Sequence, residues 1–333
     1  MLIVHMKYFL CFKNLLLLFL LLSACIFLFH PGRFAVSYDF IDTSDILSHL
    51  VTVPSPENVT KPLCPVVAHM PNRSTHADAF SLNFNESEIR MGGRWKPLHC
   101  LAQHKIALIV PYRNRKKHLE TFINYMHGFL QAQLIEYSIY VVEQTPKLAF
   151  NRGLLFNIGY SWALRYEQIP CFIFHDVDLL PENFGNIYGC TDLPRHMSCS
   201  VNTLRYHLPY GTLFGGVVAM LQAHFQMVNG FPNRYFGWGG EDDDLFIRII
   251  NKRMNIVRFA PDISRYYMMP HTKDSAPPEN LEHLKYALIN QERDGLNDYE
   301  NYYYSITKRP LPLYMLITAD LQLPESYEKM YLW

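Results

Sequence analysis

Four consecutive acids, Glu241 to Asp244, follow Trp238 and two glycines in the segment GWGGEDDDL over residues 237–245. A carboxylate beside a bound hydroxyl can take its proton as that hydroxyl attacks, which is general base catalysis. Clustered carboxylates also repel one another, and we expect this repulsion to raise the pKa of one of them toward the working pH. The glycines would let Trp238 move over a bound ligand. From residue types alone, a solvated acidic helix start explains the segment equally well.

A second pair of carboxylates, Asp176 and Asp178, ends a hydrophobic run in CFIFHDVDLL over residues 171–180. Alternation along an extended chain sends both side chains to the same side, where they could hold a divalent cation and its phosphates. A D-x-D triplet is common, and a solvated turn after a strand is an equally good interpretation. Its meaning therefore depends on the other motifs in the chain.

Five further segments accompany these acids: VPYRNR (110–115), FNRGLLFNIGY (150–160), LFGGVVAM (213–220), NGFPNRYFGWGGEDDDLFIRI (229–249) and MMPHTKD (268–274). In this order they resemble the β-1,4-galactosyltransferase family, including its N-acetylgalactosaminyl members, from about Met91 to about Asp320. The resemblance implies a GT-A fold, in which a Rossmann-like half binds a nucleotide sugar and a second half binds the acceptor.

The resemblance also implies a set of donor contacts. Arginine side chains suit this role because their forked N–H groups match phosphate oxygens, and an aromatic ring such as Tyr112 or Phe150 could stack on uracil. The expected donor-binding residues are Pro111, Tyr112, Arg113, Arg115, Phe150, Arg152, Asp176, Val177, Leu213, Trp238 and Asp274.

The metal ligands of the family correspond to Asp178, Met268 and His271. A histidine and a carboxylate suit Mn²⁺, whereas a thioether is a soft ligand for it. Met268 and His271 are three residues apart, which can bring both side chains toward one centre. The cation would offset the negative charge that develops on the departing UDP.

Catalysis is implied for Asp242, as general base for the 4-hydroxyl of an acceptor N-acetylglucosamine, and for Glu241 beside it. Direct attack opposite the leaving group would invert the anomeric configuration. Asp244 is expected to be structural. The segment over 271–288 corresponds to a lid that becomes helical when the donor is bound. The acceptor-binding residues implied by the resemblance are Tyr210, Gly240, Asp242, Asp243, Leu281 and Leu284.

Two positions depart from the galactosyl members. Leu213 stands where those members carry a tyrosine, whose bulk restricts the C2 substituent of the sugar. Leucine leaves room for an acetamido group, which favours UDP-GalNAc over UDP-Gal without rejecting galactose. Thr203 replaces a lysine near the diphosphate, and Arg205 could take over its charge.

An alternation of strands and helices must position these residues. It predicts βαβ units, an α/β fold and a mostly parallel central sheet, with ligands bound beyond the carboxyl ends of the strands. Pro111 is expected to stop the first strand. The expected elements are a strand at 106–110, a helix at 118–134, a strand at 138–144, a helix at 151–166 and a strand at 171–175.

The first 30 residues contain the run LLLLFLLLSACIFLF, with Lys7 and Lys13 before it. A cleaved signal peptide would fit its length, but no small-residue cleavage site follows, which favours an uncleaved signal anchor with a lumenal body. The sequons at Asn58, Asn72 and Asn85 agree, and we expect a type II protein of the Golgi membrane. The expected parts are a cytoplasmic tail (1–14), a transmembrane anchor (15–30), a stem (31–98) and a lumenal catalytic domain (99–333).

The remaining composition restricts the partners and the compartment. Lys plus Arg and Asp plus Glu both number 30, so no basic excess points to nucleic acid. Five of the seven cysteines follow the apolar run and allow two disulfides and one free thiol. By resemblance the pairs are Cys64 with Cys100 and Cys171 with Cys190, which leaves Cys199 free.

The sequence thus predicts an inverting, Mn²⁺-dependent transferase that forms a GalNAcβ1,4-GlcNAc linkage on a glycoprotein or glycolipid. The alternatives are a β-1,4-galactosyltransferase that uses UDP-Gal and an inactive sugar-binding or scaffolding relative. A metal-dependent phosphoester hydrolase is a further alternative. The sequence does not indicate an accessory subunit.

Overall fold

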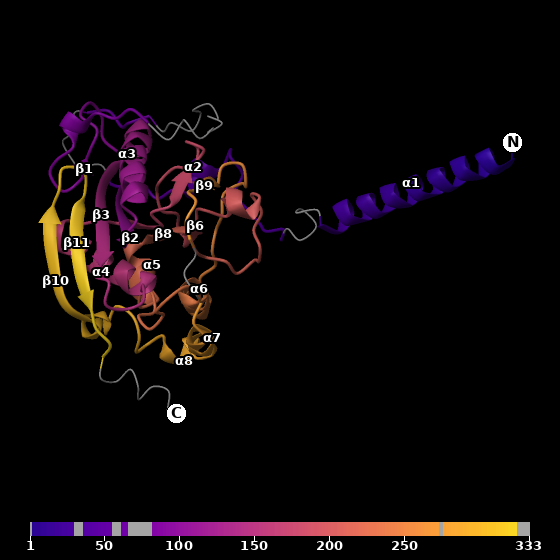
Figure 1. Cartoon of the computed structure of the whole chain (residues 1–333). Coiled ribbons are helices and arrows are strands. Elements are labelled where there is room, and N and C mark those ends of the chain that lie inside the picture. The colour runs from indigo at the N-terminus through magenta and orange to yellow at the C-terminus, as the bar shows by residue number, and fades with distance from the viewer. Residues whose placement is uncertain (1, 30–35, 55–60, 66–81, 273–275, 325–333) are drawn as a thin grey trace.

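A computed structural model describes residues 2–29, 36–54, 61–65, 82–272 and 276–324 (Figure 1). Three of the expected site residues, Asn58, Asn72 and Asp274, lie outside this part of the chain. The α-helices are α1 (Leu2–Phe29), α2 (Ile46–His49), α3 (Lys116–Ala132), α4 (Arg152–Tyr166), α5 (Gln222–Met227), α6 (Glu241–Asn251), α7 (Pro278–Lys285) and α8 (Ala287–Asn290). The short 3₁₀ helices are η3 (Glu86–Glu88), η4 (Asn202–Leu204) and η5 (Tyr299–Tyr302).

The strands form one large and one small sheet. The large sheet has the order β10-β11-β3-β2-β4-β8-β6, with β1 also paired to β3, and the small sheet has the order β5-β9-β7. The strands are β1 (Arg94–Trp95), β2 (Lys105–Tyr112), β3 (Glu136–Gln144), β4 (Cys171–His175), β5 (Leu179–Pro181), β6 (Arg195–His196), β7 (Ser200–Val201), β8 (Val217–Leu221), β9 (Arg265–Met268), β10 (Tyr303–Pro310) and β11 (Met315–Leu321).

The large sheet is mixed, so the prediction of a mostly parallel sheet is only partly right. β11, β3, β2 and β4 pair in parallel, whereas β8, β6, β10 and β1 are antiparallel to their neighbours. The parallel part comes from the βαβ units through α3 and α4, whose helical crossovers return the chain in the same direction. The antiparallel strands follow connections of other kinds, including the β10–β11 hairpin at the sheet edge in Figure 1.

The first strand of the body does not stop at Pro111, as expected, but continues to Tyr112. β2 pairs with β4 only as far as Ile109, while its pairing with β3 includes Pro111 opposite Val142. Proline lacks a backbone N–H and is tolerated where one side of a strand needs no donor. The proline therefore lies where β2 has lost one neighbour, and Tyr112 still belongs to the sheet.

Helices cover both faces of the large sheet, and side-chain alternation along β2 divides the core in two. Ile106 and Leu108 pack in a cluster with α3, whereas Ala107 and Ile109 pack in a cluster with α4 and α6. This alternation follows from the period of two along a strand. The two-sided burial makes the sheet a rigid platform, and α6 carries the four acids at the edge of the second cluster.

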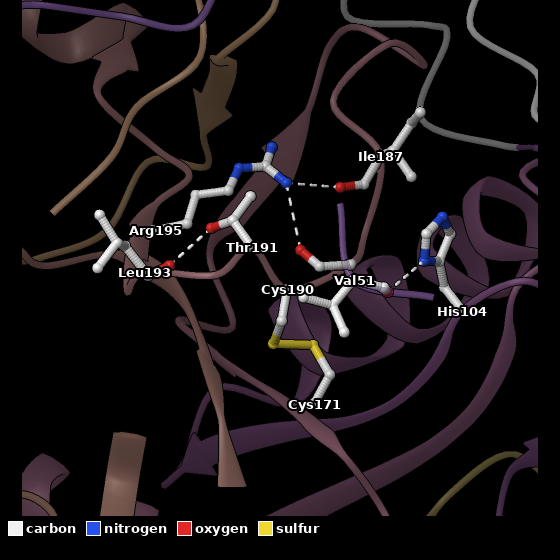
Figure 2. The surroundings of a disulfide bond; sticks show 9 residues. Val51, His104, Cys171, Ile187, Cys190, Thr191, Leu193 and Arg195 are labelled. Atoms are coloured by element: carbon white, nitrogen blue, oxygen red, sulfur yellow. Dashed lines mark hydrogen bonds between the residues drawn. A yellow bond between two sulfur atoms is a disulfide. The ribbon is translucent and has the colours of Figure 1, made fainter. Parts of the chain in front are cut away.

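Two disulfides lie where the resemblance places them, joining Cys64 to Cys100 and Cys171 to Cys190. Figure 2 shows the second one, which fastens the start of β4 to the loop that ends at Cys190. Near it the buried Arg195 donates hydrogen bonds to the carbonyls of Ile187 and Gly189, at 2.7 and 3.4 Å. This loop is thereby fixed by a covalent bond and a buried guanidinium. Cys199 is free and buried, as expected.

The N-terminal region begins with α1, which extends away from the folded body in Figure 1. Among the described residues, no helix is both long enough and apolar enough to cross a membrane. The anchor expected over 15–30 therefore stays a prediction. Residues 36–53 lie against the body, where Val51 donates a backbone hydrogen bond to Cys190 at 2.9 Å and Val53 donates one to Gln103 at 2.8 Å.

Candidate active site

The four acids of the WGGEDDD motif occupy the first turn of α6, where the positive end of the helix dipole favours negative charge. Asp242 points toward Gly215, which precedes β8. A Cβ atom built on Gly215 would lie 2.3 Å from Asp242 Oδ2, so any side chain there would collide with the carboxylate. The glycine pair of the LFGGVVAM segment thus brings backbone into direct contact with the expected general base.

Arg152, at the start of α4, connects the two acidic motifs. Its Nε donates to Asp176 Oδ1 at 2.5 Å, its Nη1 to Glu241 Oε1 at 3.2 Å, and its Nη2 to the carbonyl of Gly216 at 3.1 Å. The local fold aims this side chain, because Asn151 caps α4 by accepting a hydrogen bond from the backbone N–H of Leu154. A single guanidinium therefore joins the end of β4, the start of β8 and the first turn of α6.

Three acids of the first turn, Glu241, Asp243 and Asp244, have raised pKa values, and burial is the main cause in each. Burial, with a contribution from Asp242, raises the pKa of Glu241 to about 7 against the lowering effect of Arg152. Burial and Asp242 raise the pKa of Asp243 to about 6, and a hydrogen bond from Tyr210 opposes the shift. Glu241 Oε2 is buried without a hydrogen-bond partner, an arrangement that costs free energy in a folded protein. These raised values come chiefly from burial, and repulsion by Asp242 adds to them.

Asp244 differs from its three neighbours, in line with the structural role expected for it. Its Oδ2 accepts a hydrogen bond from the Tyr235 hydroxyl at 2.8 Å, and its Oδ1 accepts one from Arg248 Nε at 2.5 Å. Both partners are buried. This carboxylate points into the protein and has no free oxygen for a ligand.

Two of the three expected metal ligands are in contact. Asp178 Oδ2 lies 2.9 Å from His271 Nδ1 and 3.1 Å from Arg115 Nη1. Met268 lies on β9, which pairs with β5 so that Leu179 is opposite Met268. Pairing in the small sheet thus brings Asp178, which precedes β5, close to Met268 at the end of β9. His271 follows three residues after Met268.

The donor set fits a divalent cation of intermediate softness. Asp178 is buried and shares its charge with one guanidinium and one imidazole, and a cation could take the place of either. Within the described part of the chain, no three His, Cys, Asp or Glu side chains gather where they could hold a metal. A cation here would therefore need the Met268 sulfur and ligand oxygens to complete its coordination.

The expected nucleotide contacts lie at the ends of β2 and before α4. Arg113 donates to the carbonyl of Leu148 at 2.7 Å, and its guanidinium lies 5.2 Å from the centre of the Phe150 ring. Tyr112, Pro111 and Val177 are buried. Aromatic and cationic groups are therefore paired at the ends of the parallel strands, where ligands bind in open α/β sheets.

The glycine-flanked Trp238 is 59% exposed, and the glycines on both sides of it have positive φ angles. The following glycine, Gly239, would meet nothing within 4 Å if it carried a Cβ. Space and backbone conformation both allow this tryptophan to move. Of the two leucines expected at the acceptor, Leu281 is 69% exposed on α7 and Leu284 is half-buried.

Leu213 and Thr203, the two positions that depart from the galactosyl members, lie in the part of the chain that the structure describes. Leu213 is half-buried, and its backbone N–H donates to the carbonyl of Tyr210 at 3.3 Å. The Thr203 hydroxyl donates to the Met268 sulfur at 3.4 Å, which connects this position to the expected metal ligand. Arg205 is exposed.

Sequence reasoning missed Asn280, which connects the lid to the glycine loop. It is buried on α7, and its Nδ2 donates to the carbonyl of Gly239 at 2.8 Å and to that of Trp238 at 3.3 Å. Asparagine in a polar, proline-containing segment gives no signal of such a contact, because the contact joins residues 41 and 42 positions apart. Helix α7 and the loop that carries Trp238 are thus connected through one side chain.

A mixed sheet with an acid-rich helix and a D-x-D triplet beyond its strand ends is the arrangement expected of a GT-A glycosyltransferase. A family model for the N-terminal region of glycosyl transferase group 7 matches residues 63–191, and one described as the N-terminal domain of galactosyltransferase matches 195–272. The chain belongs to the β-1,4-galactosyltransferase family.

Individual relatives agree. Beta-1,4-galactosyltransferase 4 of Homo sapiens is 44% identical over 233 residues, which are 68% of this chain and 67% of that protein. Beta-1,4-galactosyltransferase 1 of Mus musculus is 40% identical over 240 residues, 71% of this chain and 60% of that protein. The catalytic domain of Drosophila beta1,4-galactosyltransferase 7, solved with xylobiose, is similar with a TM-score of 0.55 at 25% identity, over 68% of this chain and 97% of that one. A mutant of that enzyme, 24% identical here, was solved with manganese, UDP-Gal and xylobiose.

Proposed function

We propose that this protein transfers N-acetylgalactosamine from UDP-GalNAc, with inversion, to the 4-hydroxyl of a terminal N-acetylglucosamine. The observation that carries this proposal is the contact between Asp242 and Gly215, two residues after Leu213. It places the residue expected to select the donor on the segment that touches the expected base. The acceptor would be a glycan of a glycoprotein or a glycolipid.

The reaction needs a general base for the attacking hydroxyl and positive groups that stabilise the negative charge on the departing UDP. Asp242 takes the proton of the attacking hydroxyl while the hydroxyl oxygen bonds to C1 of the sugar. The bond from C1 to the diphosphate oxygen breaks on the opposite side, and its electron pair leaves with UDP. Arg152 and Arg113 present guanidinium groups at the strand ends, where they would bind diphosphate oxygens. Because the hydroxyl attacks C1 on the face opposite the departing diphosphate, the anomeric configuration is inverted.

Asp178, Met268 and His271 would hold Mn²⁺. When bound, the cation supplies positive charge against the diphosphate of the leaving group. Its presence is supported by the donor set and by the manganese in the Drosophila relative. Trp238 would cover the donor and exclude water, because hydrolysis of the nucleotide sugar is the competing reaction.

Leu213 supports the choice of UDP-GalNAc. A half-buried leucine occupies less volume than the tyrosine of the galactosyl members, which leaves space for an acetamido group. A second candidate donor is UDP-Gal, because the relatives described above are named galactosyltransferases and a larger pocket does not exclude a smaller sugar.

The site also opposes the alternatives outside this activity. An inactive sugar-binding relative would have no need for the buried, unpartnered oxygen of Glu241 or for the contact between Asp178 and His271. A phosphoester hydrolase would release free sugar without an acceptor.

The decisive experiment is a donor competition between UDP-GalNAc and UDP-Gal on an N-acetylglucosamine acceptor. The wild-type chain should favour UDP-GalNAc, and Leu213→Tyr should shift the ratio of kcat/KM values toward UDP-Gal by about tenfold or more, since steric discrimination of this kind is typically 10–200-fold. Leu204→Tyr, a substitution at an exposed leucine of η4, is the matched control. An unchanged ratio in Leu213→Tyr would show that the donor proposal is wrong.

The cellular setting is part of the same proposal. We expect an anchor at 15–30, a stem at 31–98 and a catalytic domain at 99–333 in the Golgi lumen. Two disulfides in the structure support an oxidising compartment. The exposed Asn85 is accessible to glycosylation.

A further inference from the structure

Arg258 is a buried arginine that lies outside the motifs expected to bind the donor and the acceptor. Its side chain nevertheless contacts the loop before β8. Its Nη2 donates to the carbonyls of Gly211 and Leu213, at 2.8 and 2.9 Å. Its Nε donates to His196 Nδ1 at 3.1 Å. One side chain thus fixes two carbonyls of the loop that carries Leu213 and also contacts a buried histidine.

His196 connects Arg258 to Gly215, the glycine that faces Asp242. Because His196 Nδ1 accepts from Arg258, its proton is on Nε2, which donates to the carbonyl of Gly215 at 3.1 Å. Burial and the charge of Arg258 lower the pKa of His196 to about 3, so the ring remains neutral at physiological pH. The chain of contacts from Arg258 therefore reaches the backbone against which the expected base packs.

The outer face of Arg258 is covered by the N-terminal segment, residues 36–53. The Tyr38 ring lies 5.2 Å from the guanidinium, and the Tyr38 hydroxyl is 3.1 Å from Cys199 Sγ. Ile41 donates a backbone hydrogen bond to the carbonyl of Arg258 at 2.9 Å, and Val36 donates one to Leu208 at 3.4 Å. A cation beside an aromatic ring is attracted to its face, most strongly where water is excluded.

We propose that Arg258 is a positioning residue for the loop at 211–215, and that Tyr38 of the N-terminal segment holds Arg258 in place. The catalytic unit then includes residues 36–53, well before the domain start expected at 99. The inference rests on the proposed function only in taking Leu213 as the residue next to the donor sugar. It assigns to a segment outside the matched family models a role in donor geometry.

The mechanism of this role is steric. Loss of the Tyr38 ring frees one face of Arg258, and the carbonyls of Gly211 and Leu213 lose a fixed donor. Leu213 then moves relative to Asp242, and small displacements of groups that position a substrate have large effects on rate. Donor binding and donor choice should respond, whereas the general stability of the core should not.

The test uses the full chain with Tyr38→Ala and Arg258→Lys, since lysine keeps the charge but loses the forked donors. Arg165→Lys is the matched control, because Arg165 lies 4.5 Å from the Trp162 ring on a remote surface. Amide hydrogen exchange of the peptide at 209–217 should become about tenfold faster in both variants and remain unchanged in the control. The donor KM should rise about threefold to tenfold, with a smaller change in kcat and a shift in the ratio of UDP-GalNAc to UDP-Gal use.

A merely structural role predicts a different pattern, in which kcat falls with the amount of folded protein while donor KM and donor ratio stay constant. That pattern, or unchanged exchange at 209–217, would overturn the proposal. If the wild-type chain uses UDP-Gal alone, the donor proposal fails, but the variants still test the loop with that donor. If Arg258→Lys does not fold, Tyr38→Ala gives the same measurements from the outer side of the contact.

Discussion

Two clusters of carboxylates and guanidinium groups share helix α6, and they differ in the balance of their charges. In the inner cluster, Asp244 and Asp294 face Arg248 and Arg234, so two negative charges meet two positive ones. Both oxygens of Asp244 are hydrogen-bonded. Buried ion pairs of this kind keep the helix in one position.

The outer cluster has a surplus of negative charge. Arg152 faces Asp176 and Glu241, with Asp242 close by, and one oxygen of Glu241 has no hydrogen-bond partner. Helix α6 thus contributes to one cluster whose charges balance and to one with a surplus of negative charge. The difference favours a structural role for the inner acids, whereas the outer acids carry negative charge that a bound cation or a proton would neutralise.

The largest effect should come from removing the expected base. Asp242→Asn keeps the size of the side chain but cannot accept the proton, so kcat should fall by about 10²–10⁴-fold. Initial rates of UDP release with donor and acceptor measure this loss, and binding of the donor alone, followed by calorimetry, should persist. Activity within threefold of wild type would remove Asp242 from the mechanism.

The inner cluster should respond in stability. Asp244→Ala removes the carboxylate that accepts from Arg248 Nε and leaves this buried arginine with Asp294 as its remaining acidic partner, which we expect to lower the free energy of unfolding by about 3–5 kcal/mol. Urea unfolding monitored by tryptophan fluorescence measures this change. Asp242→Asn is the matched control and should change stability by less than about 1 kcal/mol. Equal losses in the two variants would contradict the division between the clusters.

Manganese should stabilise the fold through its expected ligand Asp178, whose charge acts on Asp176 of the outer cluster. At a free Mn²⁺ concentration of about 100 times its dissociation constant, binding should add about 2.7 kcal/mol to the free energy of unfolding, and a chelator should abolish activity. Asp178→Asn should lose the stabilisation, whereas Glu120→Gln, at an exposed acid of α3, should retain it. Thermal unfolding with and without Mn²⁺ provides the measurement. Stabilisation that survives Asp178→Asn would place the cation elsewhere.

The sequence predicts the local elements of the fold well. The strand at 171–175 is found with its expected bounds, and the helices and the other two strands are confirmed within a few residues. These segments owe their structure to hydrophobic patterns that are complete within each window. The antiparallel β8 and the insertion of β11 beside β3 depend on pairing between distant segments, which no local pattern encodes.

The same distinction applies to the candidate site. Motif resemblance identified the acids of α6 and the contact between Asp178 and His271, because each motif is contiguous in the chain. It missed Asn280 and Arg258, whose partners are 41–44 and 45–62 residues away. The residues expected to do the chemistry lie in short contiguous motifs, whereas the residues that contact and position them are scattered along the chain.

The smallest expected effect concerns the pH dependence of stability. Burial, with Asp242 in α6 and Asp176 after β4 adding to it, raises the pKa of Glu241 to about 7 from 4.5, although Arg152 of α4 lowers it. Between these pH values the folded state binds the proton and the unfolded state does not, so this group makes stability fall as pH rises from about 5 to 7. Glu241→Gln removes the titration, and its free energy of unfolding should fall less steeply over this interval, while Glu120→Gln should follow the wild type. Urea unfolding at pH 5, 6 and 7 measures the slopes. A slope in Glu241→Gln as steep as in wild type would show that Glu241 is ionised throughout and that the outer cluster keeps its surplus of negative charge.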